Sequence, residues 1–309
     1  IQYSFTILSV ALGLLLYQAV AHAQTTMTGE ANGPNGSRDS WNAAVNWTAG
    51  VPSGGIAAIV GPGIFADVDN NAATPTYSGG LTLMNNASLQ VGWTNNSQGT
   101  NTNVLGTGPI TLNTGSQIIS RAGLGTYDFT QGIVLAGDAT IWSGISTANH
   151  HTTKTFSGGI SGSGQLTYNG VNNTWFDINT ANAGWTGGFQ TNDPQNQRHQ
   201  VRASADGAFG TGDVWINNNA TLQLTAGLSN TINDSAALFI NGTGSSSLGG
   251  AKLNLNSNET VAEFWINGVH QGFGTFDSST NPGVITVSGS ITVPVAPDTR
   301  PPLPNPSQF

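Results

Sequence analysis

One stretch decides the fold: Gly210-Thr-Gly-Asp-Val-Trp-Ile-Asn-Asn-Asn-Ala-Thr-Leu-Gln-Leu224. Aliphatic residues alternate with polar or aromatic ones at 213–216 and again at 221–224, and three asparagines separate the two runs. Alternation with a period of two is typical of a strand with one buried face. Asparagine tolerates left-handed backbone angles and bonds to its own main chain. The stretch therefore predicts two short strands around a polar corner.

The same pattern recurs along the chain, with starts at 81, 110, 133, 214 and 238 that are 29, 23, 81 and 24 residues apart. The interval of 81 leaves room for about three further turns if a repeat has roughly 20 to 30 residues. Units of this size cannot bury a face alone and must stack on their neighbours. We therefore expect a β-solenoid with these residues facing the interior: Leu81, Leu83, Leu89, Ile110, Leu112, Ile118, Ile133, Leu135, Ile141, Val214, Ile216 and Leu222.

The pattern also makes specific predictions about register and corners. We expect Leu81 and Ile110 to be equivalent to Val214 in the coil, because each opens a copy of the pattern. The asparagines between the strands, at 85–86, 113 and 217–219, are expected to occupy bends, some with positive φ.

The first residues predict export. An apolar run at 5–16 is too short to span a bilayer comfortably, and Ala21-His-Ala23 resembles a cleavage site. We therefore expect a secretory signal peptide at 1–23, its basic region lying before Ile1, with a membrane anchor as the alternative. Residues 24–40 are expected to be a flexible lead-in.

The remaining boundaries follow from composition. The solenoid is expected to span 41–293, followed by a Pro-rich tail or linker at 294–309. An open solenoid end would expose an apolar cross-section and unpaired strand edges. Trp41 and Trp47 are suited to cover the N-terminal end, and stacking on sugars is the alternative role for them.

Composition narrows the function. Charged residues are 7% of the chain, seven residues are basic, and the net charge is −8. Without a basic run, nucleic-acid binding is not expected. Regularly spaced aliphatic pairs argue against disorder despite the 42 glycines. The chain has no cysteine, so Cys-based zinc sites are excluded and stability must come from ladders and stacked side chains.

Three segments resemble the autotransporter-associated β-strand repeat of secreted bacterial proteins. They are Phe156–Gly170, Asn182–Phe189 and Ala208–Gly212. The chain departs from the repeat at Tyr168, where the family usually has Lys, and at 171–177, where a bulkier insert replaces a Gly-rich turn.

The resemblance covers most of residues 40–293. It implies an all-β protein with a right-handed parallel β-helix and capped ends, displayed on or released from a bacterial surface. The segments 41–52 and 264–276 resemble the ends of such proteins. Autotransporters of the family continue into a membrane barrel, whereas 294–309 is Pro-rich. Any membrane contact is therefore expected through an anchor or barrel outside this sequence.

Two pairs of carboxylates are the candidates for metal binding or catalysis. Asp67 and Asp69 would share one face of a strand and are the best calcium candidates, with a solvated turn as the alternative. Glu259 and Glu263 would share a face if their strand runs unbroken, and a glycosidase needs such a pair across a cleft.

The remaining polar residues point away from catalysis. His150 and His151 would face opposite ways on a strand, so a polar loop together with Lys154 is expected. Asp206 and Asp213 flank repeat glycines and are expected in turns. Gly-x-Ser-x-Gly, His-Glu-x-x-His and Walker motifs are absent. We expect no catalytic residue and no cofactor apart from a possible structural calcium ion.

Three tryptophans are expected to point outward because they alternate with inward residues: Trp142, Trp215 and Trp265. Such side chains stack on sugars or anchor partners, and packing under a loop is the alternative. The sequence thus predicts a secreted or surface-displayed structural or adhesion-type protein without catalytic activity, with polysaccharides or cell-surface components as partners. The alternatives are a carbohydrate-binding solenoid that uses these tryptophans and a polysaccharide lyase or hydrolase.

Overall fold

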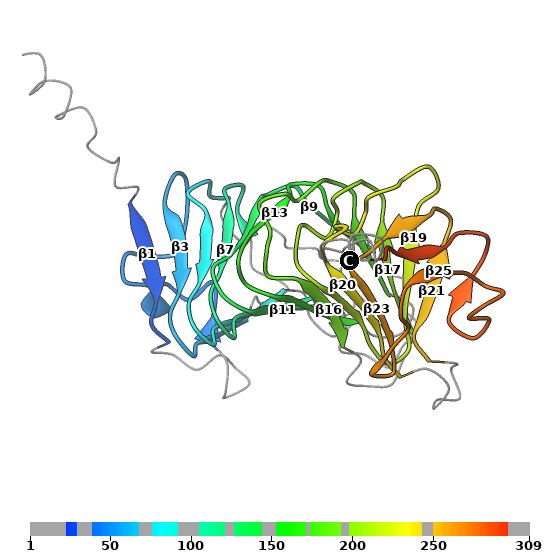
Figure 1. The fold of residues 1–309 in the computed structure, drawn as a ribbon. Helices are drawn as coiled ribbons and strands as arrows, with labels where there is room; N and C mark the ends of the chain where they lie inside the picture. Colours follow the sequence, from blue (N-terminus) through cyan, green and yellow to red (C-terminus); the bar gives the residue numbers. More distant parts are fainter. Residues whose placement is uncertain are drawn as a thin grey trace, which may run out of the picture.

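The fold is a coil of short, mostly parallel strands (Figure 1). The computed structural model describes residues 23–29, 39–67, 76–91, 105–120, 127–143, 153–170, 174–192, 198–242 and 250–295. Across these ranges the only helical element is one 3-10 turn, η1 (Ala44–Asn46). The predicted all-β solenoid is confirmed.

Two of the sheets carry the chain from its N-terminal end. The six-stranded sheet is entirely parallel and contains, in order, β1 (Gln24–Met27), β3 (Ala57–Val60), β5 (Leu81–Leu83), β7 (Ile110–Leu112), β10 (Ile133–Leu135) and β13 (Ile160–Gly162). The eleven-stranded sheet contains β2 (Asp39–Ser40), β4 (Phe65–Asp67), β6 (Ser88–Val91), β8 (Gln117–Ser120), β11 (Ala139–Ser143), β14 (Leu166–Gly170), β16 (Phe189–Asn192), β18 (Val214–Ile216), β20 (Ala237–Ile240), β23 (Glu263–Ile266) and the antiparallel β24 (Val269–His270).

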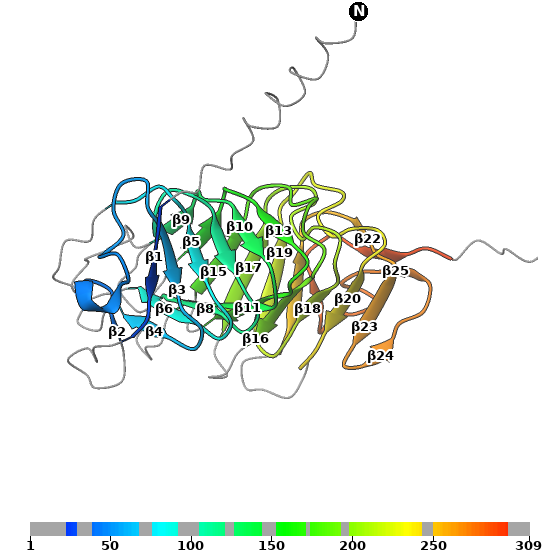
Figure 2. The ribbon, with the colours of Figure 1, turned by 90° about the vertical axis from the view of Figure 1, so that its left-hand side faces the viewer.

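Two further sheets complete the coil (Figure 2). The seven-stranded sheet contains β9 (Tyr127–Phe129), β12 (Thr153–Phe156), β15 (Thr174–Ile178), β17 (His199–Ala203), β19 (Ala220–Leu224), β21 (Lys252–Leu255) and β26 (Ile285–Thr286). The three-stranded sheet contains β22 (Glu259–Thr260), β27 (Ile291–Val293) and β25 (Gly274–Phe276). In the middle of the coil the chain visits the six-, eleven- and seven-stranded sheets in turn, as in β10, β11 and β12.

The core forms from the residues that alternate inward. All twelve predicted interior residues, from Leu81 to Leu222, are at most 1% exposed. Stacked strands place like residues in register, as when Leu81, Ile110 and Ile133 pair in β5, β7 and β10. Because parallel rungs are spaced about 4.8 Å apart, each side chain packs on its counterparts above and below.

The predicted equivalence of all five pattern copies is wrong. Leu81 and Ile110 lie in the six-stranded sheet, whereas Val214 lies in the eleven-stranded sheet and pairs with Leu238. The copy at 214–224 therefore turns a different corner of the coil. Alternation distinguishes inside from outside, but it is the same on every side of a coil.

The corner predictions are confirmed. Asn86 and Asn218 adopt left-handed angles, with φ of 59° and 55°. The Nδ2 of Asn113 donates to the carbonyl of Leu83 at 2.9 Å, which ties one rung to the preceding one. Asn217 does the same with the carbonyl of Thr191 at 2.8 Å. Asparagine therefore both shapes the bend and bonds along the stack.

The N-terminal end is covered as expected but begins earlier than predicted. Trp41 is fully buried and Trp47 is 5% exposed, with their rings edge to face at 4.7 Å. This burial excludes the alternative role in sugar stacking. Residues 24–27 form β1 and pair with β3, so the expectation of a flexible lead-in is wrong for them. The predicted signal peptide lies almost entirely, and the Pro-rich tail largely, outside the described residues.

The C-terminal end is closed by antiparallel pairs. β24 turns back on β23, and β25 runs antiparallel to β27, while β26 and β27 still add in parallel to β21 and β22. Among the helices in the described part of the chain, none is long and apolar enough to cross a membrane.

A row of phenylalanines crosses the interior. Phe129, Phe156, Phe176, Phe189 and Phe209 are each at most 3% exposed. Successive ring centroids are 4.6, 4.3, 5.5 and 5.3 Å apart. We call these five residues the inner aromatic row.

Candidate functional site

The three predicted tryptophans all lie on the eleven-stranded sheet. Trp142, Trp215 and Trp265 come from β11, β18 and β23, are half-buried, and stand between inward neighbours such as Ile141 and Ile216. Their predicted outward orientation is therefore confirmed.

Two of these tryptophans belong to one column. Register pairs Trp215 with Phe239 and Phe239 with Trp265, and His270 of the antiparallel β24 pairs with Trp265. Ring centroids along the column are 5.2, 6.0 and 4.8 Å apart. We call these four residues the outer aromatic column. Phe239, which the sequence analysis passed over, is its centre.

The rings of the column overlap only in part. Trp215 and Phe239 are nearly parallel, at 6°, yet their centroids lie 5.2 Å apart. Planes in van der Waals contact are about 3.5 to 4.0 Å apart, so the rings must be slipped past one another. Each ring therefore stabilises its neighbour and leaves part of its own surface for other contacts.

The far end of the column carries polar groups. The indole Nε1 of Trp265 donates to an Oε2 of the exposed Glu263 at 2.8 Å. His270 is exposed and its ring lies against Trp265. A ligand on this end would meet aromatic surface together with a carboxylate and an imidazole.

Trp142 stands apart from the column. Strands β14 and β16 separate β11 from β18, and Trp142 pairs with Ile119 and Asn169 rather than with aromatic residues. Its Nε1 donates to Oε1 of Gln117 at 3.0 Å. The three tryptophans thus share a face but form no single cluster.

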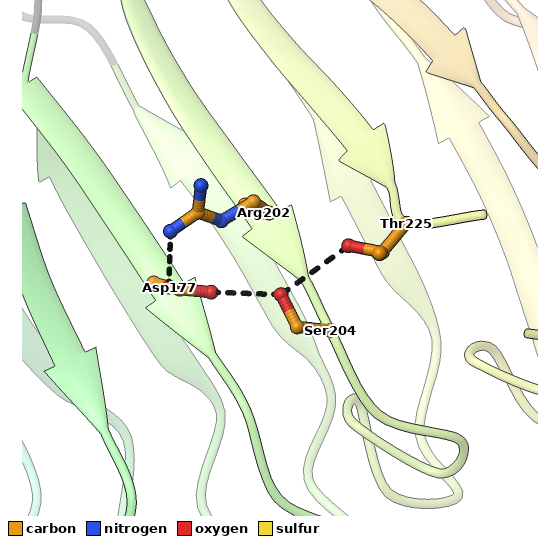
Figure 3. Close-up of polar contacts among 4 residues, drawn as sticks. All are labelled: Asp177, Arg202, Ser204 and Thr225. Atoms are coloured by element: carbon orange, nitrogen blue, oxygen red, sulfur yellow. Dashed lines mark hydrogen bonds and ion pairs between the residues drawn. The ribbon is translucent and has the colours of Figure 1, made fainter.

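A second group of outward side chains lies on the seven-stranded sheet. An Nη2 of Arg202 in β17 bonds to Oδ2 of Asp177 in β15 at 2.5 Å. The hydroxyl of Ser204 donates to Oδ1 of the same carboxylate, and Thr225 donates to Ser204 (Figure 3). The guanidinium carbon of Arg202 also lies 5.5 Å from the ring centre of Trp175.

Sequence reasoning missed this group. Trp175 and Asp177 alternate outward in β15, a regular strand that overlaps the segment 171–177, where the sequence predicts a bulkier insert in place of a Gly-rich turn. Asp177 and Arg202 are 25 residues apart, the length of one turn, and this spacing was the available signal. The bond to Asp177 raises the pKa of Arg202 more than burial lowers it.

Of the two residues in the calcium prediction, the structure describes only Asp67. Asp67 is 7% exposed, and its Oδ1 accepts a bond of 2.8 Å from the buried amide of Gln90. Asp69 lies outside the described residues. Within the ranges that are described, no group of three or more His, Cys, Asp or Glu side chains is placed to hold a metal ion.

The predicted pairing of Glu259 with Glu263 is wrong. Glu259 lies in β22, is 1% exposed, and accepts bonds from the backbone N–H groups of Thr231 and Ile232. Glu263 lies in β23, in a different sheet, and is exposed. Burial raises the pKa of Glu259 to about 7, although the backbone bonds oppose this change.

The predicted polar loop at Lys154 is also wrong. Lys154 lies in β12, pairs with Phe176 and is 1% exposed. Burial lowers the pKa of its ammonium group to about 8. The charge pattern suggested a loop, but the position of Lys154 in the alternation is an inward one. His150 and His151 lie outside the described residues.

The predictions for the turn aspartates are confirmed. Oδ1 of Asp206 accepts the backbone N–H groups of Ser229 and Asn230, both at 3.0 Å, and Oδ1 of Asp213 accepts that of Ala237 at 2.8 Å. The bonds to Ser229 and Asn230 lower the pKa of Asp206. These carboxylates join adjacent turns of the coil.

The chain was compared with known proteins at the level of family, sequence and structure. No family model, curated protein or solved structure matches the chain. The class of protein is therefore defined by its fold, a parallel β-solenoid with outward aromatic and polar groups on two of its sheets.

Proposed function

We propose that this chain is an exported, non-catalytic structural or adhesive solenoid that attaches to other surfaces through its outer aromatic column. The observation that carries the proposal is the alignment of Trp215, Phe239 and Trp265 on consecutive strands of one sheet. Half-buried rings held by a rigid sheet offer apolar contact area at little cost in conformational entropy.

The use of the carboxylates supports a structural role. Glu259 bonds to backbone in the core, Asp67 bonds to a buried amide, and Asp206 and Asp213 bond to the next turn. A general acid or base must instead reach a substrate. The resemblance of Phe156–Gly170 to autotransporter-associated repeats supports display outside the cell.

A carbohydrate-binding role is the second candidate, favoured by the same column. Slipped aromatic rings at 5.2 and 6.0 Å form a strip along the coil, and an extended polysaccharide could lie on such a strip. The two candidates differ in the partner: a glycan in the second, and any cell-surface component in the first.

The test compares binding by the purified chain with binding by two variants. Retention is measured on bacterial cell envelopes and on a panel of plant, algal and bacterial polysaccharides. The double variant Trp215→Ala/Trp265→Ala should lose retention. Trp142→Ala, which removes an outward tryptophan of the same sheet outside the column, should keep it.

The outcomes separate the alternatives. Retention on envelopes alone supports the adhesive role, and retention on polysaccharides supports the carbohydrate-binding role. Equal retention of the wild type and the double variant would refute attachment through the column. Release of reducing ends or unsaturated sugars from the panel would show that the chain is an enzyme.

A further inference from the structure

The group around Trp175 and Arg202 has the parts of a second binding site, on a different sheet from the outer aromatic column. Trp175 is half-buried, and the side chain of Arg202 is 38% exposed. Only one guanidinium nitrogen of Arg202 points to Asp177 in Figure 3, and the other terminal nitrogen points away from the carboxylate. An indole ring and a terminal guanidinium nitrogen that is directed away from Asp177 therefore lie next to each other in a partly exposed group.

Hydrogen bonds to the nearly buried carboxylate of Asp177 hold Arg202 in place. The side chain of Asp177 is only 9% exposed, and its two oxygens accept from Arg202 and Ser204. Thr225, which directly follows β19, bonds to Ser204, which directly follows β17, so β15 and the ends of these two strands contribute. An exposed ion pair gains little from its charges because it must order two long side chains. Here a buried, doubly bonded carboxylate fixes the guanidinium before any ligand arrives, which reduces the entropic cost of binding.

The side chains along the strand stack extend the site. Register places Arg202 beside Gln223, and Gln223 beside Asn254, so these side chains follow Asp177 in one outward column. Asn254 carries an Oδ1 that is buried without a hydrogen-bond partner in the part of the chain that is described. Steps of about 4.8 Å between strands repeat donors and acceptors along the coil axis.

The charge of the site selects the kind of ligand. Arg202 and Asp177 together are neutral, and the whole chain carries a net charge of −8, which repels polyanions. An indole face packs on the C–H face of a sugar ring, while guanidinium, carboxylate and amide groups bond hydroxyls as donors and acceptors.

We propose that Trp175, Arg202 and Asp177, with Gln223 and Asn254, bind a chain of uncharged sugars that runs along the coil axis over the seven-stranded sheet. This site is independent of the outer aromatic column. A protein with both would hold two glycan or surface ligands on different sides, which suits a cross-linking role.

The test is affinity electrophoresis of the full chain in gels that contain hydroxyethyl cellulose or xyloglucan, with alginate as the charged comparison. Trp175→Ala should weaken retention by about tenfold, the value of one good aromatic contact. Arg202→Lys keeps the charge but loses the planar fork, and it should weaken retention similarly. Trp175→Phe should restore part of the retention, because a flat ring remains.

Trp142→Ala is the matched control, because it removes an outward tryptophan that lies on the eleven-stranded sheet and outside the outer aromatic column. It should leave retention on these two gels unchanged, and circular dichroism should show that every variant keeps the wild-type β content. Absence of wild-type retention on both neutral polymers would overturn the proposal. So would retention that Trp175→Ala does not reduce, or a preference for alginate that weakens with salt and with Arg202→Gln. If Trp215→Ala alone abolishes retention, the outer aromatic column is the glycan site, and the site at Trp175 is refuted.

Discussion

The inner aromatic row and the outer aromatic column both bring rings together along the coil, but they differ in strand register and in their surroundings. In both, rings from neighbouring turns of the coil approach one another, with centroids 4.3 Å apart for Phe156 and Phe176 and 5.2 Å apart for Trp215 and Phe239. The inner rings are at most 3% exposed, whereas Trp215, Phe239 and Trp265 are half-buried and His270 is exposed. The outer column stacks rings that register places on neighbouring strands of one sheet, whereas the inner row passes from Phe176 in the seven-stranded sheet to Phe189 in the eleven-stranded sheet.

The difference between them lies in what the stacked rings can still do. The inner rings have almost no contact with water, so they contribute to the stability of the fold alone. The outer rings bury less area on folding and keep surface for a partner. The outer column includes two tryptophans, and the indole N–H of Trp265 donates to Glu263 at the exposed end of the column.

The largest expected effect is on the inner row. Phe156→Ala removes a ring that contacts Phe129 and Phe176 and leaves a cavity in a core without access to water. Loss of a buried Phe typically costs about 3 to 5 kcal/mol of unfolding free energy. Urea denaturation of wild type and variant measures this cost. A loss no larger than that of Trp215→Ala would show that the inner row is not the more important stack.

The second-largest expected effect is a pH dependence of stability that comes from Glu259, in the turn of the coil that carries Trp265. Glu259 lies in β22, just before β23, and burial raises its pKa to about 7. The folded state therefore favours the protonated form, so its stabilisation is fully present below about pH 4.5 and is lost as the pH rises through about 7. Over this window the unfolding free energy should fall by roughly 3 kcal/mol.

Glu259→Gln should remove this slope, because glutamine does not titrate. Denaturation midpoints at a series of pH values measure it, with Glu263→Gln as a surface control that keeps the slope. Stability that rises between pH 5 and 7 through Glu259 would contradict the expected sign.

The sequence predicted which residues lie inside the coil but not on which side of it they lie. Leu81 and Val214 both alternate with polar neighbours, and both are buried, yet they lie in different sheets. Period-two patterning fixes the face of each strand and carries no information about the corner that follows. The bends at Asn86 and Asn218 were predictable because the side chain itself favours that backbone.

The candidate sites could be predicted only in part, because alternation gives the orientation of a side chain but not its neighbours on adjacent strands. Orientation of Trp215 and Trp265 follows from alternation, but their stacking through Phe239 depends on which strands are neighbours. Asp177 and Arg202 meet only because one turn places 25 residues between adjacent rungs. The burial of Lys154 was not predictable, because a charged residue at an inward position contradicts the usual link between charge and exposure.

The smallest expected effect is the coupling within the outer aromatic column. Trp215→Ala and Phe239→Ala, alone and together, form a double-mutant cycle on unfolding free energy. Aromatic pairs contribute about 0.5 to 1.5 kcal/mol beyond the area they bury, so the cycle should give a coupling in this range. Trp215 and Trp142 lie in different columns with two strands between them, so this pair should give a coupling near zero.

The same cycle measured on binding decides what the column is for. If Trp215 and Phe239 act as one surface, either substitution should weaken retention, and the double variant should lose little more than the first, because the strip is already broken. A full additive loss would mean that each ring binds separately. Coupling in stability with unchanged retention would place the outer column with the inner row, as a second structural stack, and would leave Trp175 and Arg202 as the binding site of the coil.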